Sequence, residues 1–391
     1  MNDQIPIAKP MLGEPEIAAT RRVIESGWVT QGPEVAAFEA EFAAYVGAKY
    51  ACAVSNCTTA LHLALLGVGC ASGHDVITVS HSFIATANAI LYCGANPIFI
   101  DIEANGFNMD VSAIEAAITR DTHAILCVHQ MGMPCDINAI IEVAERHGLP
   151  VIEDAACAFG SEFKHEGRWQ RIGSPRGAVA CFSFHPRKVA TTGDGGMLIT
   201  NDPELDRRFR LWRQHGMSVS DTVRHGSRQV VHESYSEIGF NYRMTDIQAA
   251  LGREQVRRMP DMIPARRRIA RLYSERLGAI KGIGLPVEPA YARSNWQSYC
   301  IRLPLGCEQR EVMQKLLDRG ISTRRGIMNA HLEKPYLDPD QSIASSLVRS
   351  EKAQAECIML PIFAQMTDAE FERVVLEVTN VLESVEAAVV A

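Results

Sequence analysis

Lys188 stands in a setting that could support covalent chemistry. It lies between two apolar runs that favour strands, residues 179–184 and 197–200, and the turn after it contains three glycines within residues 193–196. Glycines allow a backbone to approach a ligand closely, and a lysine in a desolvated pocket has a lowered pKa and can act as a nucleophile. The stretch indicates a lysine that forms an imine with a carbonyl compound. Taken alone, it is equally typical of a surface lysine on a tight turn.

Two further polar clusters follow predicted strands. Residues 55–59, SNCTT, lie where a strand gives way to a helix, and a helix N-terminus with hydroxyls suits a phosphate, although a plain helix cap is commoner. Asp154 ends another strand, where an aspartate is usually a cap or a partner to a cation. Ligands bind at the carboxyl ends of such strands. Pyridoxal phosphate (PLP) needs a phosphate anchor, a carboxylate for its pyridinium nitrogen and a lysine for its aldehyde, so the pattern predicts a PLP site.

The order of the predicted elements is typical of an α/β fold. About seven apolar runs alternate with helices, which implies right-handed βαβ units and a mainly parallel sheet sandwiched by helices. No helix separates the last two runs, so one strand should be antiparallel. The predicted strands are residues 50–54, 75–79, 98–102, 123–128, 150–153, 179–184 and 197–200, and the predicted helices are residues 10–26, 35–46, 59–66, 84–92, 111–118 and 137–146.

The pattern changes after Gly252. We expect a long helix over residues 254–277, then a linker rich in glycine and proline, a strand over residues 298–303, and helices over residues 308–319 and 366–390. The sequence thus predicts a large PLP-binding domain over residues 1–255, which includes the N-terminal helices, and a small α+β domain over residues 256–391. The long helix carries arginines that we interpret as a solvated face, namely Arg257, Arg258, Arg266, Arg267, Arg268 and Arg271.

Composition excludes several classes of function. The 391 residues carry a net charge of −7 without a basic block, which argues against nucleic acid as a partner. Eleven scattered cysteines without a C-x-x-C pair argue for a reducing compartment and against a disulfide framework or a metal site. No apolar run is long enough to span a membrane, and the N-terminus does not resemble a signal peptide. We therefore expect a cytoplasmic protein.

In this context the chain resembles the sugar aminotransferases of the DegT/DnrJ/StrS type, which are fold-type-I PLP-dependent enzymes. The resemblance covers nearly the whole chain, and the joint order and spacing of its segments are highly specific. The segments are SGWVTQGPEVAAFE (26–39), AVSNCTTALHLAL (53–65), SFIATANAI (82–90), VIEDAACAFGS (151–161), FSFHPRKVATTGDGGMLIT (182–200), GFNYRMTDIQAALG (239–252) and LPIF (360–363).

The resemblance implies roles for individual residues. Lys188 corresponds to the lysine that forms a Schiff base with PLP, and Asp154 to the partner of the pyridine nitrogen. Phe83 corresponds to the aromatic residue that stacks on the cofactor ring. Asn241 corresponds to a residue that reaches the phosphate in the neighbouring subunit, which implies a homodimer with shared active sites. The residues that correspond to the phosphate cradle are Thr58, Thr59 and Ser183.

Two positions depart from the family pattern. Cys157 stands where the family often has a glutamine near the ring hydroxyl, and Phe159 stands where it often has a histidine. The loop over residues 323–331 resembles the mobile substrate loop of the family, although for a lone histidine a plain hydrogen-bonded role is equally typical. The candidate contacts to a sugar substrate are Trp28, Thr30, His185, Arg325 and His331.

The resemblance implies an aminotransferase that moves an amino group, by family habit from glutamate, to a nucleotide-linked 4-keto or 3-keto deoxysugar in amino sugar biosynthesis. One alternative is a cyclitol aminotransferase of aminoglycoside assembly. Another is a PLP-dependent sugar dehydratase, in which a histidine replaces the lysine; here Lys188 is present and His185 does not take its place. A non-catalytic regulator would lack the lysine or the aspartate. A dehydrogenase would need G-x-G-x-x-G, which SNCTTA does not supply.

Overall fold

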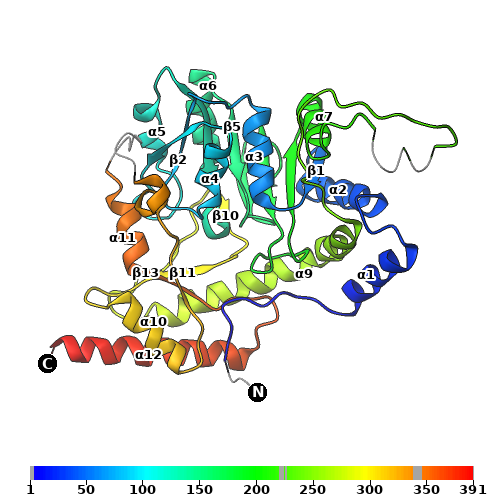
Figure 1. The fold of residues 1–391 in the computed structure, drawn as a ribbon. Helices are drawn as coiled ribbons and strands as arrows, with labels where there is room; N and C mark the ends of the chain where they lie inside the picture. Colours follow the sequence, from blue (N-terminus) through cyan, green and yellow to red (C-terminus); the bar gives the residue numbers. More distant parts are fainter. Residues whose placement is uncertain (1–3, 220–223, 225–226, 338–345, 391) are drawn as a thin grey trace.

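A seven-stranded sheet forms the centre of the computed structural model, which describes residues 4–219, 224, 227–337 and 346–390 (Figure 1). Its strand order is β1-β9-β8-β5-β4-β2-β3. Only β9 runs antiparallel to its neighbours in this sheet, as the missing helix between the last two apolar runs predicted. The strands are β1 (Tyr50–Val54), β2 (Asp75–Val79), β3 (Asn96–Ile100), β4 (Thr122–Val128), β5 (Val151–Asp154), β8 (Val179–Ser183) and β9 (Gly196–Thr200).

Both faces of the sheet are covered, which explains the continuous apolar runs. Side chains alternate between the faces, so that Val76 packs into one cluster of buried residues and Ile77 into the other. The helices on the first face are α3 (Cys57–Gly67), α4 (Ala85–Tyr92) and α7 (Pro203–Trp212), and those on the second are α2 (Pro33–Val46), α5 (Val111–Ala117), α6 (Ile137–His147) and α9 (Asp246–Leu277). The predicted α/β fold, with a mainly parallel sheet sandwiched by helices, is confirmed in this arrangement.

Most predicted boundaries hold to within a few residues, and three helices differ more. Helices α7 and α11 (Val348–Glu356) were not predicted at all. Helix α9 begins at Asp246 rather than at residue 254, because Thr245 and Gln248 form a capping box at its start. Helix α1 (Glu14–Ser26) packs on α9 through Ala19, Val23 and Ala250.

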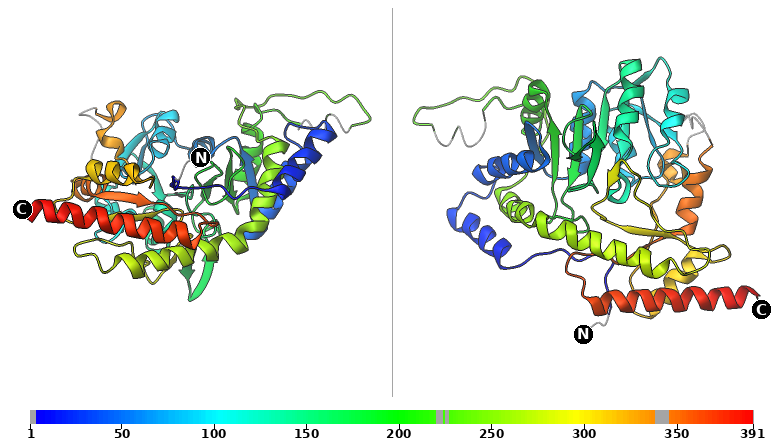
Figure 2. Two further views of the ribbon diagram at one scale, coloured as in Figure 1. Left: turned by 90° about the horizontal axis from the view of Figure 1, so that it is seen from below. Right: turned by 180° about the vertical axis from the view of Figure 1, so that it is seen from behind.

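The C-terminal part has a core of its own around a second sheet. That sheet has the order β11-β13-β12, and Figure 2 shows α9 passing beneath the large sheet toward it. Its elements are β11 (Tyr299–Arg302), α10 (Gln309–Asp318), β12 (Arg324–Arg325), α11 (Val348–Glu356), β13 (Cys357–Leu360) and α12 (Asp368–Val390), together with the short 3-10 helices η2 (Ala330–Leu332) and η3 (Lys334–Tyr336). The domain boundary between residues 255 and 256 stays a prediction. Helix α9 continues across this position without a break, and Ile5 from the N-terminal part packs in the C-terminal core.

Two smaller elements lie near the carboxyl edge of the large sheet. A three-stranded sheet of order β10-β6-β7 contains the predicted hairpin. Its strands are β6 (Glu162–His165), β7 (Arg168–Arg171) and β10 (Ala292–Arg293), and the 3-10 helix η1 (Gln130–Gly132) follows β4. Among the described residues, no helix combines the length and the apolar composition that crossing a membrane requires.

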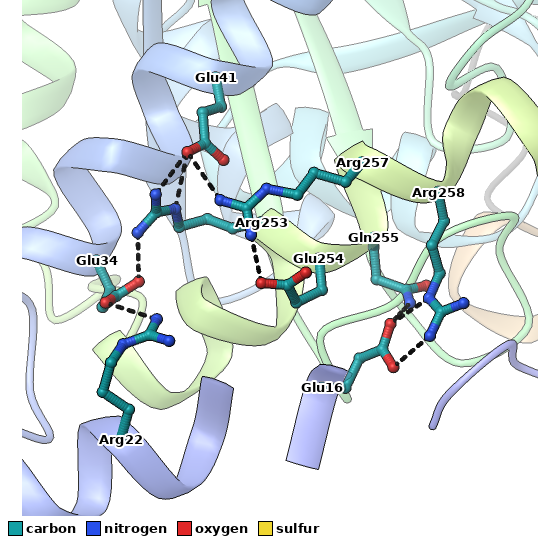
Figure 3. A network of polar contacts seen from close by, with 9 residues as sticks. All are labelled: Glu16, Arg22, Glu34, Glu41, Arg253, Glu254, Gln255, Arg257 and Arg258. Atoms are coloured by element: carbon teal, nitrogen blue, oxygen red, sulfur yellow. Dashed lines mark hydrogen bonds and ion pairs between the residues drawn. The ribbon is translucent and has the colours of Figure 1, made fainter. Parts of the chain in front are cut away.

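Arginines of α9 pair with acidic residues of α1 and α2 (Figure 3), and the prediction that Arg258 is solvated is wrong. The Arg258 Nε atom lies 2.5 Å from Glu16 of α1, whose side chain is only 3% exposed. Arg253 bridges Glu34 and Glu41 of α2 at 2.8 and 2.6 Å. The sequence showed a polar helix face but not the acidic residues that α1 and α2 bring to it. This network holds both N-terminal helices against α9.

Two further arginines of α9 are wrongly predicted as solvated. Arg266 is 5% exposed, and it donates hydrogen bonds to main-chain carbonyls, as Arg267 does too. Three arginines of the set keep largely exposed side chains, as predicted: Arg257 pairs with Glu254, Arg268 with Asp368 and Arg271 with Glu275 at the surface. Most of the polar face of α9 therefore has structural partners.

Candidate active site

Asp154 lies at the carboxyl edge of the large sheet in a fixed orientation. It is the last residue of β5 and is only 5% exposed. One carboxylate oxygen accepts a hydrogen bond from the Thr86 hydroxyl at 2.8 Å, and the other accepts one from the Ala156 amide at 3.1 Å. Burial raises the pKa of Asp154 above its usual value, although these bonds and the charge of Lys188 oppose the shift. A cation beside this carboxylate would relieve the cost of burial.

Lys188 points toward the same place from the loop after β8. Its Nζ atom donates a hydrogen bond to the Cys157 Sγ atom at 3.0 Å. Burial lowers the pKa of Lys188, but Cys157, Asp154 and Cys57 favour the ammonium form, so the net pKa lies above the usual value. The lowered pKa that the sequence predicted is therefore wrong for the cofactor-free protein. The prediction considered desolvation and could not include the thiol and the carboxylate in the same pocket.

The N-terminus of α3 completes this group. Asn56 caps the helix by accepting a hydrogen bond from the Thr59 amide at 3.0 Å, which leaves the amides of Cys57 and Thr58 in the first turn for a ligand. Cys57 lies close enough to Asp154 and Lys188 for their charges to affect its pKa, which burial raises well above its usual value. A Cβ atom at Gly196 would collide with the Asn56 main chain, so glycine is required where β9 approaches this helix.

Of the predicted phosphate cradle, Thr58 and Thr59 lie in the first turn of α3 and are partly buried. Ser183 ends β8, is 8% exposed, and its hydroxyl accepts a hydrogen bond from the His185 amide at 3.4 Å. The strand register places Ser183 opposite Gly196, which itself contacts the cap of α3. These hydroxyls therefore surround the same helix N-terminus.

Phe83 and Asn241 differ from these residues because they face solvent. Phe83 is 63% exposed and lies one helical turn before Thr86. Asn241 is exposed, and its segment is held to the end of β1 by a hydrogen bond from the Ser55 amide to the Tyr242 carbonyl at 2.8 Å. The described residues between α7 and α9 include a part that extends away from the rest of the molecule in Figures 1 and 2.

The loop over residues 28–32 is well anchored. Trp28 is partly buried, and its indole donates a hydrogen bond to the Gln31 carbonyl at 3.2 Å. Thr30 is exposed, and its carbonyl accepts a hydrogen bond from the Asp246 amide at 3.1 Å. The Asp246 carboxylate accepts one from the Gly32 amide at 2.7 Å. The loop therefore has a fixed base on α9 and an exposed tip, and its contact with a substrate stays a prediction.

The remaining substrate candidates lie in different settings. His185 is exposed, and its Nδ1 atom accepts a hydrogen bond from the Arg187 amide at 3.2 Å. Arg325 is exposed on β12. His331 is 8% exposed, and its ring nitrogens contact the Ser80 hydroxyl at 2.6 Å and Glu351 at 3.3 Å. The partners of His331 fit the plain hydrogen-bonded role, and its predicted contact with a substrate gains no support.

Sequence reasoning missed residues that orient the site. Thr86 holds Asp154 and lies one helical turn after Phe83, a spacing that could have indicated it. The His129 amide donates a hydrogen bond to the Asp154 carbonyl at 3.1 Å, and the His129 ring contacts Glu153 at 3.0 Å. His129 directly follows β4, so its position after a predicted strand was a usable signal.

A separate cavity of about 500 Å³ lies between η1, the loop over residues 103–108 and residues 284–302. Its walls are largely apolar, with Glu103 and Arg302 among the polar residues. Its lining does not include Lys188, Asp154 or Cys157. The candidate reactive residues therefore lie at the carboxyl ends of β5 and β8, and this cavity is not the candidate active site.

The residues at that edge fit PLP. The helix N-terminus suits the phosphate, the buried Asp154 carboxylate suits a protonated ring nitrogen, and the Lys188 amine suits the aldehyde. The Cys157 thiol lies 3.0 Å from the Lys188 amine, so it would be among the side chains beside the bound cofactor. Among the described residues, no group of three or more side chains could hold a metal ion.

Comparisons with known proteins agree on one protein family. The model of the DegT/DnrJ/EryC1/StrS aminotransferase family matches residues 10–379. The spore coat polysaccharide biosynthesis protein SpsC of Bacillus subtilis (strain 168) is 35% identical over 389 residues, which cover 98% of this chain and 99% of SpsC.

Solved structures are similar over the same length. DesV of S. venezuelae, solved in complex with a ketimine intermediate, is 34% identical with a TM-score of 0.85, over 98% of this chain and 99% of DesV. The PLP form of the putative sugar aminotransferase Spr1654 of Streptococcus pneumoniae is 25% identical with a TM-score of 0.89, over 98% of this chain and 99% of that one.

Proposed function

Because the chain belongs to the DegT/DnrJ/EryC1/StrS aminotransferase family and is a PLP-dependent aminotransferase, we propose that it transfers an amino group from glutamate to a nucleotide-linked keto-deoxysugar. The observation that carries the proposal is the meeting of Lys188, Asp154 and the N-terminus of α3 at one sheet edge. The similarity to SpsC and to DesV supports a sugar as the acceptor. A 4-keto or 3-keto deoxysugar is the acceptor that we propose.

PLP, when bound, supplies an aldehyde that takes up the amino group and a ring that accepts electrons. In our proposal Asp154, held by Thr86 and Ala156, keeps a proton on the ring nitrogen. The Lys188 amine would take up and return the proton at the substrate carbon. Such general acid–base transfer contributes about 10²–10⁴-fold, or roughly 3–5 kcal/mol of barrier. The amides and hydroxyls at the start of α3 anchor the phosphate.

Lys188 also decides between reactions on this scaffold. A sugar dehydratase of the family would carry a histidine in its place, so the presence of Lys188 favours transamination. Transamination of a keto-cyclitol uses the same residues and is an outcome of the test below. Eleven free thiols support a reducing compartment, and we propose the cytoplasm.

We also propose that a second copy of the chain covers the open side of the site. Phe83 is 63% exposed, and the segment between α7 and α9 carries further exposed apolar side chains. These are Val230 at 85%, Tyr235 at 60% and Ile238 at 90% exposure. Large apolar side chains on an extended segment are typical of an interface between subunits. Asn241 would then approach the phosphate in the partner's site.

The test supplies the purified holoenzyme with glutamate and a panel of ketones, and follows the absorbance of the bound cofactor together with 2-oxoglutarate. The panel contains nucleotide-linked 4-keto and 3-keto deoxysugars, the same sugars without the nucleotide, and a keto-cyclitol. We expect turnover with a nucleotide-linked sugar and much less with its free sugar. Turnover with the keto-cyclitol alone, or release of water without an amine product, would contradict the proposal.

A further inference from the structure

The segment over residues 294–298, SNWQS, connects the C-terminal part to the loops of the active site. Asn295 lies at its centre and is fully buried. The carboxamide nitrogen of Asn295 donates hydrogen bonds to the main-chain carbonyls of Cys157 at 2.8 Å and Phe159 at 2.9 Å. Asn295 therefore fixes the loop in which the Cys157 thiol contacts Lys188.

The segment itself is held in a strained conformation. Trp296 has a φ of 53°, in the left-handed region that costs a non-glycine residue about 1–2 kcal/mol. The Asn295 side-chain oxygen accepts a hydrogen bond from the Gln297 amide at 2.8 Å, which closes the turn around Trp296. The Arg266 guanidinium of α9 donates to the Trp296 carbonyl at 3.0 Å and to the Gln297 carbonyl at 2.8 Å. Such strain persists only where the surroundings determine the conformation.

A second set of contacts reaches Lys188 and the loop after β4. The Gln297 side chain donates a hydrogen bond to the carbonyl of Arg187, the residue before Lys188, at 3.0 Å. The Ser298 amide donates to the Met131 carbonyl at 3.3 Å. A Cβ atom at Gly132 would collide with the Asn295 side chain, so glycine is required there. One short segment thus fixes the main chain beside both members of the Cys157–Lys188 pair.

We propose that Asn295 is a positioning residue of the reaction, which sets the contact between the Cys157 thiol and the Lys188 amine by fixing the main chain at Cys157. The inference rests on the proposed function, in which Lys188 binds the cofactor and carries the proton. Asn295 acts through Cys157 and does not itself touch the reacting atoms. The charged and titratable groups near the Lys188 amine include Cys157, Asp154, Cys57 and His185. Of these, Asn295 directly holds only the loop that carries Cys157.

Asn108 provides a matched control. It is 2% exposed, and its carboxamide donates hydrogen bonds to the carbonyls of Met133 at 3.2 Å and Pro134 at 2.9 Å. Its oxygen accepts a hydrogen bond from the Gln130 amide at 2.9 Å. The set of bonds is the same as that of Asn295, but it holds the loop after β4. Asn108→Ala should therefore lose comparable stability without moving Cys157.

The test measures the pH midpoint of the absorbance change of the bound cofactor, which reports the environment of the nitrogen that Lys188 supplies. We expect Asn295→Ala to shift the midpoint by about 0.5–1 pH unit, as Cys157→Ala does, because both remove the thiol contact. The double variant should shift no further, since the two changes act on one contact. Asn108→Ala should leave the midpoint in place. Where Asn295→Ala does not fold, Gln297→Ala, which frees the Arg187 carbonyl and the Ser298 hydroxyl but leaves the Cys157 carbonyl bonded, should give a smaller shift.

An unchanged midpoint in Asn295→Ala beside a shifted one in Cys157→Ala would overturn the inference, and so would additive shifts in the double variant. The labelling rate of Cys157 by iodoacetamide in cofactor-free protein gives a second readout; it should differ several-fold between Asn295→Ala and Asn108→Ala, and equal rates would count against the inference. Failure of the proposed function looks different, because cofactor absorbance would then persist in Lys188→Ala.

Discussion

The two sides of the active site are built in different ways. On the inner side Asp154 is 5% exposed and Lys188 contacts Cys157 at 3.0 Å, so one chain orients every group that moves a proton in our proposal. On the outer side Phe83 is 63% exposed and Asn241 faces solvent. The comparison indicates that a single chain orients the residues at the carboxyl edge of the sheet, whereas in our proposal a second copy of the chain encloses the cofactor. Substitutions on the inner side should therefore impair the active site of the chain that carries them. Substitutions on the outer side should impair the active site of the partner subunit.

The largest effect is expected on the inner side. Lys188→Ala should fold, lose the visible absorbance of the lysine-linked cofactor, and lower turnover by at least about 10²–10⁴-fold, because it removes the amine that carries the proton in our proposal. Circular dichroism and absorbance spectra measure fold and cofactor separately. Arg187→Ala, one residue away and exposed, is the control and should keep the absorbance. Transamination at an unchanged rate in Lys188→Ala would contradict the assignment.

A mixing experiment tests whether residues on the outer side contribute to the active site of the neighbouring subunit. Asn241→Asp places a negative charge where our proposal puts the phosphate of the neighbouring site, so this variant should be nearly inactive. When it is unfolded and refolded together with Lys188→Ala, about half of the dimers are mixed, and one of the two sites in each is intact. Activity should then return to about a quarter of the wild-type value.

Two controls define the mixing experiment. Each variant refolded alone should remain inactive, and a mixture of Lys188→Ala with Asp154→Asn should gain nothing, because both residues belong to the inner side of one chain. Recovery in that second mixture, or none in the first, would show that the two sides are not divided between chains as we propose.

Phe83 should contribute less. Phe83→Ala removes a ring that, in our proposal, stacks on the cofactor, and such aromatic contacts are worth about 0.5–1.5 kcal/mol, or roughly 2–10-fold in the dissociation constant of PLP. Titration of cofactor-free protein with PLP measures the change. Phe83→Tyr keeps the ring and should bind like the wild type. A loss well beyond tenfold would mean that Phe83 also supports the fold of the inner side.

The smallest effect concerns pH. Burial raises the pKa of Asp154 in the cofactor-free protein, so the folded chain keeps the proton to a higher pH than the unfolded chain does. The resulting stabilisation is complete below the unfolded value of about 4 and is lost as the pH rises through the folded value. Urea unfolding of cofactor-free protein should therefore show this decline, and Asp154→Asn should reduce it. An equal slope in both proteins would mean that other groups cause the decline.

Sequence patterns predicted the parts of the site that depend on local rules. Strand-like runs and the residues that follow them placed Asp154 and Lys188 at one sheet edge, because parallel strands bring their carboxyl ends together. The raised pKa of Lys188 could not be predicted in this way, since it depends on a thiol 31 positions away along the chain. The same holds for Arg266, which is buried against the SNWQS segment. Contacts between distant segments leave no periodic signal.

Identification of the lysine that carries the cofactor tests the central claim most directly. The holoenzyme is reduced with borohydride, digested, and the modified peptide is identified by mass spectrometry. We predict the cofactor on Lys188 alone, with no modification when Lys188→Ala is treated in the same way. Attachment to another lysine, or the absence of any attached cofactor in active wild-type enzyme, would contradict the account.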